Sequence, residues 1–149
     1  MLEQQIEQDI KTAQLAGETH KLTTLRGIKA VLLNVKVATG KRDSGLTDEE
    51  VLQQLTKQVK QRQESAEMYV QGGDQVRADK ELEEKAILEA YLPEQLNEED
   101  IAKLIDAAIA ETGATGLADM GKVIGKVKGQ AGATADGSII ARLTKEKLQ

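Results

Sequence analysis

Apolar residues recur at helical spacing along nearly the whole chain, and no run alternates with period two for long enough to suggest a strand. The pattern predicts an all-α protein with seven helices. In chain order, the apolar positions that mark these helices are Leu2, Ile6, Ile10 and Ala13; Leu22, Leu25, Ile28, Leu32 and Val35; Val51, Leu55, Val59 and Ala66; Val76, Leu82, Ala86, Leu88 and Tyr91; Ile101, Leu104, Ile105, Ala108 and Ile109; Leu117, Met120, Ile124 and Val127; and Ile139, Ile140 and Leu143.

Glycines and capping residues mark the ends of the predicted helices. Gly17 and Gly40 end the first two helices. Thr47 followed three residues later by Glu50 predicts a capping box at the start of the third helix. Further amino-terminal caps are predicted at Asn97 and Asp136. The segment from 129 to 134, which is rich in glycine and alanine, is predicted to be a mobile loop.

Pro93 is the only proline, and it divides the predicted helices into two groups. Proline cannot donate a backbone hydrogen bond and disfavours helical geometry at the residue before it, so the fourth helix should stop near Leu92. We therefore expect a four-helix amino-terminal domain over residues 1–92 and a three-helix carboxy-terminal domain over residues 97–149. The second, of about 50 residues, is near the lower size limit for independent stability.

The composition favours a protein of a reducing compartment. The chain has no cysteine, which excludes disulfides, a thiol nucleophile and a thiolate zinc site. Residues 1–10 carry acids and glutamines instead of the pattern of a secretory signal, and no stretch approaches the roughly 20 apolar residues of a membrane span. A cytoplasmic location and no membrane contact are expected.

Charge is distributed unevenly along the chain, whose net charge is −5. Residues 1–112 hold 14 Lys and Arg against 22 Asp and Glu, a net charge of −8, whereas residues 113–149 hold 6 against 3, a net charge of +3. A polyanion would therefore meet a local basic patch rather than a basic surface.

Side chains able to carry catalysis or hold a cofactor are scarce. His20 is the only imidazole and is expected to be a solvated side chain at a helix end. Two of three carboxylate clusters, at 48–50 and 98–100, fall in first helical turns, where the backbone dipole favours negative charge; the third covers 81–84. No phosphate loop is present. The sequence thus predicts no catalytic residues, no metal site and no cofactor.

Gly121, Gly125 and Gly129 recur at every fourth residue and share one helix face, with Lys122 and Lys126 beside it. In one interpretation a phosphate backbone approaches this face and the lysines neutralise it, with three further cations contributing, Lys128, Arg142 and Lys145. In the other interpretation the glycines allow close packing against a second helix, and the lysines are simply solvated.

A second group of cations, Arg26, Lys29 and Lys36, flanks the apolar stripe of the second helix. These side chains could bind an anion, but pairing with acids of the third and fourth helices is favoured because such acids are abundant. Tyr69 and Tyr91 are the only aromatic residues, whereas proteins that bind single strands usually stack bases on several rings. Any RNA should therefore be recognised through its phosphate backbone and its shape.

Several segments together resemble the YqeY-like family. The most informative is Tyr91-Leu92-Pro93-Glu94-Gln95-Leu96, and the resemblance is strongest over residues 46–96. It also includes the segments 21–26, 60–66, 83–89, Met120-Gly121-Lys122-Val123 and Ala135-Asp136-Gly137. Where the family typically has Met-Pro this chain has Lys128-Gly129, and where it has Gly-Arg this chain has Ala133-Thr134, so one expected cation is missing.

The resemblance implies that the carboxy-terminal part is related to the tail of the B subunit of the tRNA-dependent amidotransferase, a region associated with holding tRNA. Neither the glutaminase site nor the phosphorylating site of that enzyme has a counterpart here, so an enzyme assignment would rest on analogy of fold alone. We therefore expect a non-catalytic helical module that binds tRNA or a tRNA-handling complex. The alternatives are a protein-interaction adaptor without RNA contact, or an auxiliary of glutamine-dependent carbon-nitrogen ligase (amidotransferase) activity with amidotransferase subunits as partners. The sequence specifies no oligomeric state.

Overall fold

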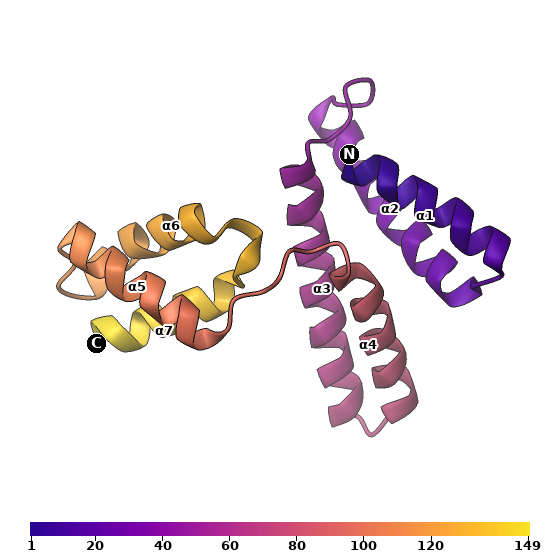
Figure 1. Ribbon diagram of the computed structural model, residues 1–149. Coiled ribbons are helices and arrows are strands. Elements are labelled where there is room, and N and C mark those ends of the chain that lie inside the picture. Colours follow the sequence, from indigo (N-terminus) through magenta and orange to yellow (C-terminus); the bar gives the residue numbers. More distant parts are fainter. The chain divides into compact units, whose positions relative to one another are not determined.

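The computed structural model describes residues 1–149, and all of its regular structure is helical (Figure 1). This confirms the all-α prediction and all seven expected helices. They are α1 (Leu2–Ala16), α2 (Thr19–Thr39), α3 (Asp48–Gln71), α4 (Gln75–Glu89), α5 (Glu98–Thr112), α6 (Met120–Ala131) and α7 (Gly137–Leu148). Two single 3₁₀ turns flank α6, η1 (Leu117–Asp119) and η2 (Gly132–Thr134).

The chain divides into two compact units, Met1–Leu92 and Pro93–Gln149. The first, which we call unit 1, contains α1 to α4, and the second, unit 2, contains α5 to α7 with both 3₁₀ turns. The grouping is compatible with the predicted four and three helices. That each unit is an independently folding domain stays a prediction.

Unit 1 is built from two helical hairpins, α1 with α2 and α3 with α4 (Figure 1). Their apolar stripes meet in one core, which consists of Ile6, Ile28, Leu32, Leu46, Val51, Leu55 and Leu88. This core covers the amino-terminal half of α3 and the carboxy-terminal end of α4. Beyond it, α3 and α4 continue in contact with each other, and the residues buried there are the small Ala66 and Ala78. We call this second part of the α3–α4 hairpin, residues 62–85, the arm.

Local sequence signals set the helix ends as predicted. Gly17 and Gly40 take left-handed backbone conformations, with φ of 72° and 70°, that close α1 and α2. In the capping box, the Thr47 hydroxyl accepts the Glu50 N–H at 3.2 Å and the Glu50 carboxylate accepts the Thr47 N–H at 2.9 Å. The Asn97 side chain caps α5 by accepting the Asp100 N–H at 2.8 Å.

Unit 2 has a separate core between its three helices. Val123 and Val127 of α6 are fully buried against α5 and α7, and the other members of this core are Ile101, Ile105, Ala108, Ala131, Ala135, Ile140, Leu143 and Leu148. Each of the three helices contacts the other two. The faces of these helices that are directed away from the core are therefore available to solvent within the unit.

The segment from 129 to 134 is helical, so the prediction of a loop is wrong. Its first three residues complete α6, and the rest form η2. The Leu96 N–H donates to the Thr134 carbonyl at 2.8 Å, and the Gln95 side chain donates to the Ala133 carbonyl at 2.8 Å. These contacts and the burial of Ala131 hold a segment whose composition alone is typical of a loop.

The fourth helix ends at Glu89, slightly before the predicted stop at Leu92. The Tyr91 hydroxyl donates to the Asp9 carboxylate at 2.5 Å, which ties the residues after α4 to α1. Burial, together with this hydrogen bond, raises the pKa of Tyr91. None of the helices is both long enough and apolar enough to pass through a membrane.

Candidate nucleic-acid interface

The three glycines of α6 lie on the side of the helix opposite to the core of unit 2. At about 100° per residue, Gly121, Gly125 and Gly129 span an arc of about 80°. Val123 and Val127, which are fully buried, lie on the reverse side. We call the outward arc the glycine face.

No neighbouring helix lies against the glycine face within unit 2. A Cβ atom built at Gly121, Gly125 or Gly129 would have no heavy atom within 4 Å. None of the three has the positive φ that would require glycine for conformational reasons. The interpretation in which the glycines pack against another helix of the unit is therefore wrong. Glycine also lowers helix propensity, by about 0.5–1 kcal/mol relative to alanine at an interior position such as Gly125.

Three of the five predicted lysine and arginine residues border the glycine face. Lys122 and Lys126 lie on one edge, and Lys128 lies on the other, about 20° from Gly121 around the helix axis. Lys122 and Lys128 are exposed and form no ion pair. Lys128 extends toward the start of α7. Its Cε atom lies 3.2 Å from the position that a Cβ atom would take if Gly137 were replaced by a larger residue.

Lys126 is partly buried and forms an ion pair with Glu111 in the last turn of α5. Its positive charge is thus largely compensated in the free protein. A phosphate oxygen would have to compete with the Glu111 carboxylate for Lys126. This pairing could not be predicted from the sequence, because it depends on how α5 packs against α6.

The other two predicted cations, Arg142 and Lys145, project from α7. Arg142 forms ion pairs with Glu98 at the start of α5 and with Glu146 at 3.3 Å. Glu98 and Glu111 are 13 residues apart on α5, so their backbones are separated by about 20 Å along the helix. The structure therefore does not bring Arg142 together with Lys126. Lys145 is exposed and forms no ion pair.

Acids of α5 compensate much of the positive charge of the last 37 residues. Lys147 pairs with Asp106 at 2.7 Å, in addition to the pairs at Lys126 and Arg142. Unit 2 as a whole holds 7 Lys and Arg against 9 Asp and Glu, a net charge of −2. A charge count that begins at residue 113 omits α5 and so overstates the basic character of the surface.

Two cations of α2 pair with acids of α1, whereas the prediction was pairing with acids of the third and fourth helices. Lys29 contacts Glu7 at 3.3 Å and Lys36 contacts Glu3 at 2.7 Å, so their partners belong to α1 and not to α3 or α4. The reason is the α1–α2 hairpin, which brings these residues side by side. Arg26 is exposed and has no ion pair.

His20 and two of the carboxylate clusters have structural explanations. His20 contacts Glu83 of α4 at 3.5 Å. The carboxylates 48–50 and 98–100 occupy the first turns of α3 and α5, as expected. No three His, Asp or Glu side chains gather in an arrangement suited to a metal ion.

The chain belongs to the YqeY-like family. The family model described as Yqey-like protein matches residues 3–148, which is nearly the whole chain and includes both units. A search of curated proteins returned no match. The family assignment confirms the resemblance found in the sequence, and it does not by itself specify a ligand.

Proposed function

We propose that the protein is a non-catalytic tRNA-binding module, and that unit 2 contacts the phosphate backbone through the glycine face of α6. The observation that supports this most directly is the open glycine face bordered by Lys122, Lys126 and Lys128. Glycines within a helix lower its stability, and no packing contact within the unit compensates for that loss. Close approach of an external backbone is a use that would account for them.

The lysines suit a phosphate ligand because they lie on both edges of the glycine face. A strand of phosphates lying along the face would meet ammonium groups on either side, while the absent side chains would let it approach the helix. Arg142 and Lys145 would supplement this contact only for an RNA that extends over α7. A tRNA ligand would also agree with a cytoplasmic location.

The test is a titration of the full chain with bulk tRNA at several salt concentrations. If about three or four phosphates are neutralised, log affinity should fall against log salt with a slope of about −2 to −4. The variant Lys122→Glu, Lys126→Glu should flatten that slope by about two contacts. The control Lys57→Glu, Lys103→Glu has the same net charge but leaves the glycine face intact, and it should bind nearly as the original chain does.

Two results would overturn the assignment. One is the absence of tRNA binding at low salt. The other is an equal loss of binding in the two double variants, which would show that only net charge matters. Circular dichroism of each variant separates a lost contact from a lost fold.

An adaptor function is the second candidate, and a specific observation favours it. A groove of about 340 Å³ lies along the arm, where Val70 is 52% exposed and Leu82 is 39% exposed. Exposed aliphatic side chains bordering a groove are typical of protein contacts. A pull-down from cytosol with and without ribonuclease separates the two functions, because only an adaptor keeps its partners after RNA is removed. Loss of those partners in a Val70→Asp variant would assign them to the groove, and amidotransferase subunits among them would indicate the auxiliary role.

A further inference from the structure

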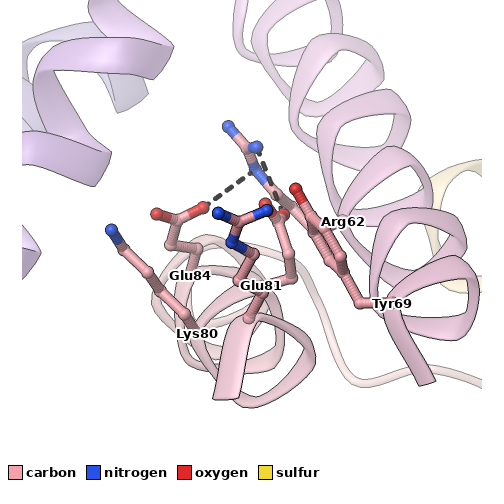
Figure 2. Close-up of a pocket in the computed structure, with 6 residues that line it drawn as sticks. Arg62, Tyr69, Lys80, Glu81 and Glu84 are labelled. Atoms are coloured by element: carbon pink, nitrogen blue, oxygen red, sulfur yellow. Dashed lines mark hydrogen bonds and ion pairs between the residues drawn. The ribbon is translucent and has the colours of Figure 1, made fainter. Parts of the chain in front are cut away.

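The other side of the arm carries a pocket that the proposed function does not use. It has a volume of about 290 Å³ and lies between α3 and α4, lined by Arg62, Tyr69, Arg77, Lys80, Glu81 and Glu84. Figure 2 shows Arg62 and Tyr69 entering from α3 and Lys80, Glu81 and Glu84 from α4. The buried residues of the two helices in this part of the hairpin are the small Ala66 and Ala78.

An arginine held by two carboxylates forms one wall of the pocket. Arg62 contacts Glu81 at 3.3 Å and Glu84 at 3.5 Å, and both glutamate side chains are more than four-fifths buried (Figure 2). Each ion pair uses the Oε2 atom of the glutamate, so the Oε1 atoms of Glu81 and Glu84 have no partner. These two oxygens therefore remain able to accept hydrogen bonds from N–H groups.

A second wall is aromatic. The guanidinium carbon of Arg77 lies 5.9 Å from the centroid of the Tyr69 ring, within the range of a cation–π contact. The chain has only two aromatic residues, and the other, Tyr91, is bound to Asp9. Tyr69 is the aromatic residue that lines this pocket.

Two cations stand at the opening. Arg77 and Lys80 are three residues apart on α4 and so lie on neighbouring positions of the helix surface. Arg77 is 70% exposed and shares its charge with Asp74 at 3.4 Å, and Lys80 is exposed and forms no ion pair. An anionic group of a ligand would meet both side chains.

We propose that this pocket binds a guanosine 5′-phosphate group, either as a free nucleotide or as an unpaired guanosine in RNA. The base would stack on Tyr69, as unpaired bases do on aromatic side chains. Guanine has adjacent N1–H and N2–H donors on one edge, and the free carboxylate oxygens of Glu81 and Glu84 are acceptors for such donors. The phosphate would contact Arg77 and Lys80. The volume is at the lower end of the range of about 300–1,000 Å³ for ligand pockets, which suits a single base.

The test is a titration of the full chain with GMP, IMP and AMP and with inorganic phosphate, followed by calorimetry or by NMR shifts of the arm. IMP lacks only the exocyclic amine of GMP, so it should bind about tenfold more weakly because one hydrogen bond to a charged acceptor is lost. Tyr69→Leu should weaken GMP binding by about tenfold, whereas Tyr69→Phe retains the ring and should bind as before. Lys57→Ala removes a lysine of α3 outside the pocket and is the matched control.

A short oligoadenosine with one central guanosine, compared with the same oligomer carrying inosine, separates the two sources of the ligand. If the chain prefers guanosine in the oligomer but does not bind GMP, the site is assigned to RNA. If it binds GMP but not the oligomer, the site is assigned to a free nucleotide. Any of three results would overturn the proposal. The first is equal binding of GMP, IMP, AMP and phosphate, and the second is no binding of either GMP or the oligomer. The third is no effect of Tyr69→Leu on binding. The Lys122→Glu, Lys126→Glu variant should bind GMP unchanged, so failure of the tRNA site and failure of this pocket are distinguishable.

Discussion

The ammonium group of Lys126 on α6 is bound to the carboxylate of Glu111 at the end of α5. This ion pair links the glycine face to the acidic helix of unit 2. Because Glu111 and an RNA phosphate would compete for the same cation, the pair gives the proposed interface a lower affinity than its lysines alone would provide. Removing the Glu111 carboxylate should strengthen tRNA binding, which gives a test of the proposed interface.

The variant Glu111→Gln should bind tRNA a few-fold more tightly at low salt, with a steeper salt dependence, because Lys126 then becomes available to a phosphate. Asp106→Asn is the matched control, since it removes the same charge but releases Lys147, which does not border the glycine face. Gel-shift or fluorescence titration measures both. Equal gains in the two variants would mean that general repulsion by the acids of α5, and not this pair, limits binding.

The variant Gly125→Ala should make the protein more stable while weakening tRNA binding. The added methyl group meets nothing within 4 Å and the backbone is helical, so alanine should stabilise α6 by about 0.5–1 kcal/mol. The same methyl group would stand between α6 and an approaching backbone. Thermal unfolding and tRNA titration test the two effects separately. A variant that is more stable and binds equally well would show that the glycine face is not a contact surface.

The variant Ile105→Ala should unfold unit 2 and leave unit 1 folded. Ile105 is fully buried in the core of unit 2, and removing such a side chain lowers stability by about 2–5 kcal/mol. A unit of this size has a total stability of about 3–9 kcal/mol, so the loss is a large part of it. Cleavage by a glutamate-specific protease should accelerate at Glu94 and Glu111 but not at Glu64 or Glu67 in α3. Acceleration at all four residues would show that the chain unfolds as one cooperative unit.

Unit 1 should lose stability on acidification partly through Glu3. This carboxylate contacts Lys36 at 2.7 Å and accepts the Leu46 N–H at 2.9 Å. Burial raises the pKa of Glu3, but the hydrogen bonds from Lys36 and Leu46 lower it by more, so the net direction is downward from 4.5. Since the pKa is lower in the folded than in the unfolded chain, the stabilisation is present above about pH 4.5 and is lost as the pH falls through the folded pKa.

The variant Glu3→Gln should therefore unfold at a lower temperature than the original chain at pH 7, and the difference should shrink as the pH is lowered past 4.5. Melting curves at a series of pH values measure this. Glu64→Gln removes the same charge from an exposed position of α3 without an ion pair and should show no such convergence. A constant difference between Glu3→Gln and the original chain at all pH values would contradict the assignment.

The sequence by itself determined the helices, most of their ends and the family, because these depend on neighbours a few residues apart. Gly17 and Gly40 close helices through their own backbone freedom, and Thr47 reaches Glu50 within one turn. The helical spacing of apolar positions also indicated the buried face of most helices, but not of α4, where Val76 is 81% exposed and Ala78 is buried instead. The seven helices could be predicted for this reason.

The pairing of charges was decided only by the tertiary structure. Arg142 meets Glu98 across 44 residues, and Lys29 meets Glu7 because two helices form a hairpin. Such contacts depend on how helices pack, which a pattern along one chain does not specify. The same holds for the arm, where Arg62 meets Glu81 because α3 and α4 form a hairpin. The sequence supplied the cations and acids, and the packing of the helices decided which of them remain available to a ligand.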